Sequence, residues 1–195
     1  MAMPENQLSP DPIMGDYLSP DDRIRSSLLI DYELGGIGIG DPSQGLQCQV
    51  WETRLFTGII QTRPESGGVW YDIVSGASIT EISLAFDQVM RPSVAFVDSG
   101  NSKFYWYDAN STSYVTTDLI GATSPVVMMD DKRDMEVGLN DVLLFYLLSG
   151  RVKHRRQRDR YLIEYDLAAV PTGTTRIRRS GMTRANRIML EFELA

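Results

Sequence analysis

The sequence predicts an all-β fold. Its antiparallel meanders resemble propeller blades and form either a compact β-domain or an incomplete propeller, with an extended N-terminal arm. Runs of β-branched and aromatic residues recur along the chain and are broken by Gly, Asn, Asp and Pro, as in strands joined by turns. Helical periodicity is scarce, and two segments of similar sequence follow one another. We therefore divide the 195 residues into an arm, 1–22, and a β-domain, 23–195.

The arm is rich in proline, which fixes φ and removes a backbone donor. Met14, Tyr17 and Leu18 give it apolar side chains with which to dock on a neighbouring subunit. The alternative is an arm that is disordered in isolation. Residues 21–29 predict at most one short turn of helix. The N-terminus lacks a basic start followed by an apolar stretch, so we expect no signal peptide.

The β-domain contains a series of short predicted strands separated by turn residues. In chain order they are 47–51, 68–74, 93–97, 103–107, 113–118, 175–179 and 187–194. The turn Asp98-Ser99-Gly100-Asn101 joins the third and fourth of them into a hairpin. The turn Asp108-Ala109-Asn110 leads to the fifth, which extends that hairpin.

Segments 86–119 and 130–167 share the order of their features, and Ser99-Gly100 in the first matches Ser149-Gly150 in the second. The offset of about 44 to 50 residues is near the repeat length of propeller blades. A fainter earlier copy covers 46–82. Only about three or four blades fit in this length, at or below the usual minimum of four. An incomplete propeller and a plain antiparallel meander therefore both remain open.

Residues suited to enzyme chemistry are few. The only histidine, His154, and the only cysteine, Cys48, are distant in sequence, and a catalytic pair or a zinc site needs further partners. The glycines of 36–40 are spaced like part of a dinucleotide loop, but 41–43 do not begin a helix. Asp130-Asp131 lacks the spaced ligands of a calcium loop. We therefore expect no enzyme, no metal and no cofactor.

The formal net charge of −7 is unevenly distributed. Residues 1–150 hold 8 basic and 21 acidic residues, whereas 151–195 hold 11 basic and 5 acidic residues. Such a chain can pair head to tail with copies of itself, acidic surface against basic. Alternatively, the two regions neutralise each other within one fold. The longest apolar run, 142–148, is far shorter than the ~20 residues that span a bilayer, so we expect no membrane segment.

Six of the ten residues in 151–160 are Arg or Lys. On a strand, Lys153, Arg155 and Gln157 would face one way, and the alternate residues His154, Arg156, Arg158 and Arg160 the other. Contact with nucleic-acid phosphates is one interpretation, but the net negative charge of the chain argues against it. A second is an interface with an acidic surface of another subunit, for which Arg is favoured. A third is a solvated hairpin.

Several strings in 35–195 resemble a family of tailed-bacteriophage virion structural proteins, associated with the tail. They include FDQ at 86–88, DDKR at 130–133 and QRDRY at 157–161. The resemblance implies a non-enzymatic tail hub, nozzle, adaptor or tail-tip subunit, assembled as a ring in the host cytoplasm and retained in the virion. Its partners would be copies of itself and other tail proteins. The resemblance carries over no catalytic residue.

We expect the subunit interface to include basic residues of 151–160 and apolar residues of the arm: Arg151, Lys153, Arg155, Arg156, Arg158, Arg160, Met14, Tyr17 and Leu18. An alternative function is a receptor- or carbohydrate-binding module at the tail tip. Trp70, Tyr105 and Trp106 would then stack on sugars, unless they pack the core. A polysaccharide-degrading enzyme is a further alternative, and it would need a pair of carboxylates in one cleft.

Overall fold

The computed structural model describes residues 34–38, 49–64, 68–87, 91–130, 141–182 and 188–195. Strands make up most of these ranges, together with one short 3-10 turn, so the all-β prediction is confirmed. The arm, the segment 21–29 and Cys48 lie outside the described residues. No helix in the described ranges has the length and apolarity needed to cross a bilayer.

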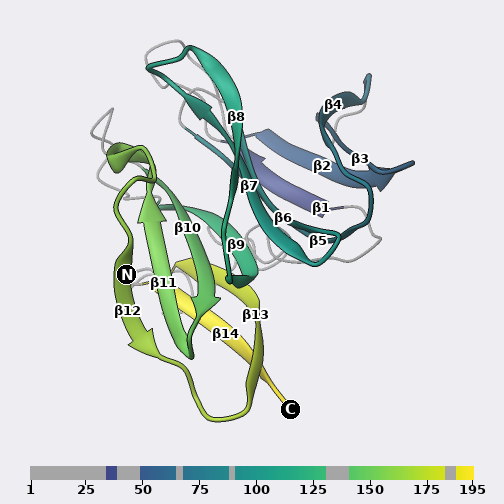
Figure 1. Ribbon diagram of the computed structural model, residues 1–195. Helices are drawn as coiled ribbons and strands as arrows, with labels where there is room; N and C mark the ends of the chain where they lie inside the picture. The colour runs from purple at the N-terminus through teal and green to yellow at the C-terminus, as the bar shows by residue number, and fades with distance from the viewer. Residues whose placement is uncertain (1–33, 39–48, 65–67, 88–90, 131–140, 183–187) are drawn as a thin grey trace, which may run out of the picture.

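The strands form four antiparallel sheets, each continuous in sequence (Figure 1). The first sheet contains β1 (Leu34–Gly38), β2 (Gln49–Phe56), β3 (Ile59–Pro64) and β4 (Tyr71–Ser75). The second contains β5 (Ile79–Phe86), β6 (Pro92–Asp98), β7 (Asn101–Asp108) and β8 (Ser113–Asp118). The third contains β9 (Thr123–Asp130), β10 (Asp141–Leu148), β11 (Arg151–Arg156) and β12 (Tyr165–Ala169). The fourth has two strands, β13 (Thr174–Met182) and β14 (Ile188–Leu194).

The second and third sheets correspond to the two similar segments of the sequence. The segments align at Phe86 and Asp130, which are the last residues of β5 and β9. The first strand of each sheet, β5 or β9, therefore precedes the segment in which the sequence similarity is found. The fainter copy expected over 46–82 corresponds to the first sheet, which begins at Leu34.

A two-residue turn with φ positive at both positions joins the second and third strands of each four-stranded sheet. The φ values are 48° and 77° at Thr57-Gly58, 53° and 79° at Ser99-Gly100, and 53° and 72° at Ser149-Gly150. Such turns match the right-handed twist of the paired strands, and glycine adopts positive φ without steric cost. The hairpin predicted at Ser99-Gly100 is confirmed by the pairing of Asp98 with Asn101.

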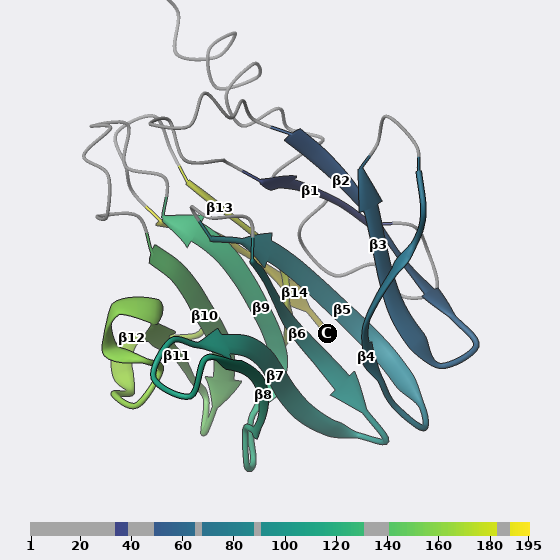
Figure 2. The same ribbon diagram turned by 90° about the horizontal axis from the view of Figure 1, so that it is seen from above.

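The sheets pack face to face in chain order, and the first strands of consecutive sheets, β1, β5, β9 and β13, lie beside one another. Figure 2 shows the second sheet between the first and the third. Three apolar clusters fill the interfaces between successive sheets, centred on Ile60 and Phe96, on Phe104 and Leu144, and on Phe145. This arrangement is that of propeller blades, in an array of three full sheets and one half sheet.

Buried serine hydroxyls connect the first strands, which belong to different sheets and share no backbone ladder. Ser83 Oγ on β5 accepts a hydrogen bond of 2.9 Å from the N–H of Val127 on β9. Ser124 Oγ on β9 accepts one of 2.8 Å from the N–H of Ile177 on β13 and donates to its carbonyl at 3.2 Å. The serines thus satisfy buried backbone groups where one sheet meets the next.

Candidate functional site

The basic segment 151–160 is only partly a strand. β11 ends at Arg156, and a 3-10 turn, η4 (Gln157–Asp159), follows. The prediction of alternating faces through Arg160 is therefore wrong after Arg156. The chain reverses at Arg160 and Tyr161, whose φ values are 52° and 56°, and the Tyr161 N–H bonds the Arg156 carbonyl at 3.0 Å.

The basic residues of β11 pair with carboxylates on or next to the neighbouring strand β12. Arg151 Nε lies 2.6 Å from Asp166 Oδ1, and Lys153 Nζ lies 3.3 Å from Asp166 Oδ2. Hydrogen bonds from these two side chains lower the pKa of Asp166. Arg155 Nη2 lies 3.4 Å from Glu164, and its Nε donates to the Tyr146 hydroxyl at 2.8 Å.

The side chains of the following turn reach buried aspartates at the ends of other strands. Gln157 Nε2 donates to Asp87 Oδ2 at 3.1 Å, just after β5. Arg160 donates to both carboxylate oxygens of Asp108, at the end of β7. Asp87 follows β5 and Asp108 ends β7, both in the second sheet, whereas η4 lies between β11 and β12 of the third sheet. The turn therefore connects the two sheets.

Two further arginines in this region hold acidic groups within or near the third sheet. Arg158 pairs through its side chain with Asp141, the first residue of β10, and its N–H bonds the same carboxylate at 3.0 Å. Arg156 Nε lies 2.7 Å from Asp159 Oδ2, and the hydrogen bond lowers the pKa of Asp159. The string QRDRY thus forms part of a polar contact between sheets.

Tyr161 completes this contact with apolar packing. Its ring meets those of Phe104 and Trp106 edge-on, at centroid distances of 4.6 and 4.9 Å. Trp106, one of the three aromatic residues considered for sugar stacking, is only 7% exposed and packs in the core. Burial raises the pKa of the Tyr161 hydroxyl well above its usual value. We define residues 157–161 as the inter-sheet clamp.

All six basic residues expected at a subunit interface have an acidic partner within the chain. Two of the pairs, Arg158 with Asp141 and Arg160 with Asp108, join the basic region to the acidic one, and the other pairs lie within the basic region itself. Arg151, Arg158 and Arg160 remain about half exposed, and a role between subunits stays a prediction for all six. Met14, Tyr17 and Leu18 lie outside the described residues.

His154 lies in an aromatic stack on β11, between Phe145 at 5.8 Å and Tyr165 at 5.0 Å between ring centroids. Its buried Nδ1 has no hydrogen-bond partner within the described ranges. Burial, and next the charge of Arg156, lower its pKa. Among the residues that the structure describes, no carboxylate bonds the ring and orients it as a catalytic base would require. The described residues also contain no cluster of His, Cys, Asp or Glu that would hold a metal.

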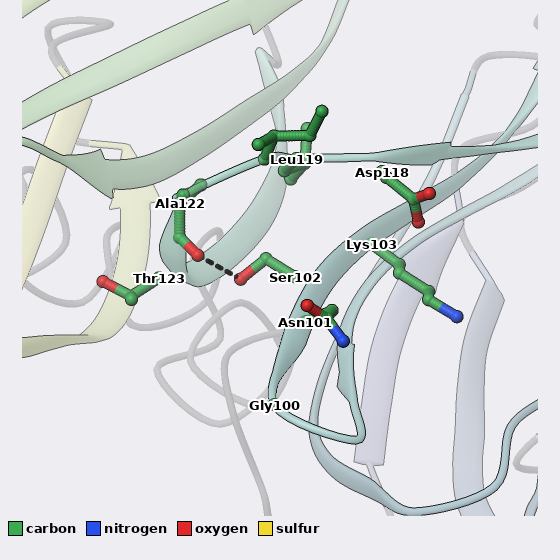
Figure 3. A pocket seen from close by; sticks show the side chains of 10 residues that line it. Gly100, Asn101, Ser102, Lys103, Asp118, Leu119, Ala122 and Thr123 are labelled. Carbon is green, nitrogen blue, oxygen red and sulfur yellow. Dashed lines mark hydrogen bonds between the residues drawn. The ribbon is translucent and has the colours of Figure 1, made fainter.

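A hollow of about 540 Å³ lies where the β6–β7 turn meets the connection from β8 to β9 (Figure 3). Ser102 Oγ donates to the Ala122 carbonyl across its floor at 2.9 Å. Lys103 and Asp118 line it, and Lys103 Nζ also lies 2.9 Å from Asp98. Its described lining contains one carboxylate, which does not make the carboxylate pair that glycoside hydrolysis requires.

A second hollow, of about 290 Å³, lies between the first and second sheets and is lined largely by aromatic and apolar side chains. We name it the tyrosine cleft, and its lining residues are Thr62, Tyr71, Asp72, Ile73, Phe86, Pro92, Tyr105 and Tyr114. Tyr105 is thus the one predicted sugar-stacking residue that lines it. Trp70 packs instead against the guanidinium groups of Arg54 and Arg63, which lie 4.1 and 4.4 Å from its ring centroid.

The fourth sheet covers only part of the third. β13 packs on β9 and at a few positions on β10, and Leu190 and Phe192 of β14 reach the apolar cluster there. On the same face of β14, Ile188 and Leu194 are 37% and 57% exposed. The apolar face of this sheet therefore extends beyond the core that it covers.

Sequence reasoning missed the tyrosine cleft because it combines residues from two sheets. It missed the uncovered face because the exposure of Ile188 and Leu194 depends on how much of the third sheet lies against β14. A search of family models, curated proteins and solved structures found no match to this chain.

Proposed function

We propose that the chain is a non-enzymatic structural subunit of a tailed-phage virion, whose copies assemble head to tail into a ring. Its place would be the tail, as a hub, nozzle, adaptor or tail-tip subunit, with other tail proteins as further partners. Assembly would take place in the host cytoplasm, without contact with a membrane or nucleic acid.

The half-sized fourth sheet is the observation that carries this proposal. Among the described residues, three sheets have four strands and the last has two, so the described part of the array presents different surfaces at its two ends. At the fourth-sheet end, Ile188 and Leu194 are exposed beside the last core. Contacts between unlike ends are heterologous, and they close into a ring when the rotation between subunits allows it. The family-like strings FDQ, DDKR and QRDRY supply the link to phage tails.

Light scattering after size-exclusion chromatography of the full chain tests the assembly. The double variant Ile188→Glu, Leu194→Glu places two charges on the uncovered face, and we expect it to be monomeric where the original chain forms a ring. Ile120→Glu is the matched control, because Ile120 is 91% exposed and lies outside the fourth sheet. A monomeric original chain, or a double variant of unchanged mass, contradicts the ring. Absence of the protein from purified particles contradicts the assignment to a virion.

Arg151 offers the cleanest test of the expected basic interface. Its side chain is 45% exposed and bonds only Asp166 among the described residues. We expect Arg151→Glu to weaken assembly while the fold is retained. Charge reversal at Arg155, Arg156 or Arg158 is less informative, because these residues also hold acidic groups inside the chain.

A receptor- or carbohydrate-binding module at the tail tip is the second candidate function. The tyrosine cleft favours it, because aromatic rings line one hollow. Saccharide binding by the purified chain tests it.

A further inference from the structure

We propose that residues 23–28 of a second copy add as a strand to the free edge of β14 and extend the fourth sheet. This inference rests on the self-association in the proposed function, and it names the segment that makes the contact. Residues 23–28 lie outside the described residues, whereas β14 and its surroundings are described. The added strand would replace the short helical turn predicted over 21–29.

The outer edge of β14 has no strand beside it among the described residues, because the fourth sheet consists of β13 and β14 alone. The backbone N–H and C=O groups of such an edge can pair with a further strand. β14 is seven residues long and contains no proline that would interrupt a ladder. In each of the other three sheets, the second strand is paired on both sides.

The third sheet continues beyond β14 and offers a surface to the added strand. Phe145 of β10 belongs to the apolar cluster that Ile177 and Phe192 of the fourth sheet reach. His154 and Tyr165 are the next residues across β11 and β12, and their rings stack in that order beside Phe145. A strand beside β14 would therefore lie over this row of rings.

Glu191 and Glu193 make the opposite face of β14 acidic. Both side chains are about half exposed, and they point away from the cluster that contains Phe192. On the β13 side, Arg176 lies 2.5 Å from Glu193 and Arg178 lies 3.9 Å from Glu191. Opposite charges on neighbouring strands stabilise their pairing. A strand with two basic residues at alternate positions would flank the glutamates from the free side.

The segment 23–28 begins with the sequence that β13 uses to pair with β14. β13 reads Arg-Ile-Arg-Arg-Ser over 176–180, and a bulge there accommodates one extra residue. Without that residue, the string is the Arg-Ile-Arg-Ser of 23–26. An antiparallel strand in the same register would place each residue opposite one of β14: Arg23 and Glu193, Ile24 and Phe192, Arg25 and Glu191, Ser26 and Leu190, Ser27 and Met189, Leu28 and Ile188.

The strand would come from a second copy, because the link to its own β1 is too short. In this register it ends beside Ile188, where β13 also ends. β1 begins at the opposite end of the sheets, as do β5, β9 and β13. The six residue steps from Leu28 to Leu34 span at most ~22 Å. The return along β14 takes ~20 Å, and two strand spacings and one sheet spacing add ~14 Å sideways.

Direct pairing of two β14 strands is excluded by the third sheet. Identical antiparallel edge strands are related by a two-fold axis perpendicular to the sheet, so both copies keep the same face on the same side. The third sheet of the partner would then occupy the space beside β14 over which β11 and β12 extend. A single extended segment fits there, because it brings no sheet of its own.

Disulfide cross-linking of the full chain tests the register and the source of the strand. Ser27→Cys and Met189→Cys, in a Cys48→Ser background, place two thiols opposite each other on the outer face. Opposite residues of antiparallel strands have Cβ atoms ~4.5–5.5 Å apart, which is close enough for a disulfide after a small adjustment. We expect the oxidised double variant to form covalent multimers. A double variant without a disulfide overturns the proposal.

Coexpression of the two single variants, each with its own tag, identifies the copy. We expect a covalent dimer that carries both tags. A disulfide that forms in the double variant but only within one chain overturns the second copy as the source. Ser27→Cys with Glu193→Cys is the matched control, because the register places these residues four positions apart. Equal cross-linking in this control overturns the register.

Charge variants test the contact with Glu191 and Glu193. Added to the cross-linking pair, Arg23→Glu with Arg25→Glu replaces attraction by repulsion, and we expect the cross-linked fraction to fall about tenfold. Arg23→Lys with Arg25→Lys keeps both charges and should cross-link as the original does. Circular dichroism confirms that each variant folds. Equal cross-linking by the Glu and Lys variants overturns the charge pairing that selects this segment.

Light scattering on the same samples separates this inference from the ring. A ring whose chains do not cross-link contradicts the added strand alone. Cross-linked chains that stop at a closed dimer contradict the ring alone, and a monomeric chain contradicts both.

Discussion

Arg160 donates two hydrogen bonds to the carboxylate of Asp108, from Nε at 3.1 Å and from Nη2 at 2.9 Å. The first residue follows the 3-10 turn of the third sheet, and the second ends β7 of the second sheet. The parallel bonds of a guanidinium to a carboxylate fix both distance and orientation. This pair lowers the pKa of Asp108 and links two sheets that share no backbone ladder.

Replacing Arg160 should loosen the inter-sheet clamp. We expect Arg160→Ala to lower the Tm more than Arg151→Ala, although both remove one arginine from an ion pair. Arg151 bonds a carboxylate of its own sheet, whereas Arg160 connects two sheets. Thermal unfolding followed by circular dichroism measures both. Equal losses in the two variants would show that the bond between sheets contributes no more than a surface ion pair.

Removing the Tyr161 ring should leave a cavity against Phe104 and Trp106. By analogy with other buried aromatics, we expect Tyr161→Ala to reduce the free energy of unfolding by about 3–5 kcal/mol. Tyr161→Phe retains the packing and should have a much smaller effect. Urea unfolding measures each value, with the exposed Leu162→Ala as the control. A loss in Tyr161→Ala no larger than in the control contradicts the packing role.

Ser83→Ala should destabilise the junction between β5 and β9. The substitution leaves the buried N–H of Val127 without its 2.9 Å bond, and an unsatisfied buried donor costs about 1–3 kcal/mol. Ser113→Ala, at an exposed position on β8, is the matched control. Hydrogen exchange should accelerate at the Val127 amide in the first variant and stay unchanged in the second. Unchanged exchange at Val127 contradicts the serine bridge.

Stability should fall in mild acid through His154. Because burial lowers the pKa of His154, the unfolded chain binds its proton at a higher pH than the folded chain does. The free energy of unfolding therefore decreases as the pH falls below about 6.5, the ordinary pKa of histidine. Urea titrations above and below this pH should show the loss. His154→Phe keeps an aromatic ring in the stack and should remove most of the pH dependence in this window. An unchanged slope in the variant would assign the effect to other groups.

Local patterns located several of the strands, although β3, β5 and β9 were not among those predicted. The second-sheet strand Ser113–Asp118 has its predicted bounds, and the Ser-Gly turns mark the hairpins, because strand alternation and turn chemistry are properties of neighbouring residues. The boundaries of the predicted repeats differ from the boundaries of the sheets by one strand. β5 and β9 are the first strands of their sheets, but the similarity between them begins only at Phe86 and Asp130.

The sites were harder to predict, because they depend on which sheets meet. The segment containing Arg158 and Arg160 predicted an exposed basic strand, and nothing local indicated Asp141 and Asp108 as partners. The tyrosine cleft likewise joins Tyr71 of β4 to Tyr114 of β8, through the packing of two sheets. Trp106 shows the same limit, since its burial follows from the ring of Tyr161, which comes from the next sheet.

The serine bridges have an evolutionary consequence. Ser83 and Ser124 join successive sheets through side chains alone, so the gain or loss of one whole sheet by gene duplication or deletion would break no ladder. It would change one apolar face, a few hydroxyl contacts and, between the second and third sheets, the inter-sheet clamp. A gene of this kind can lengthen or shorten its product by one four-stranded sheet at a time. Natural variants of the array should therefore differ by whole sheets.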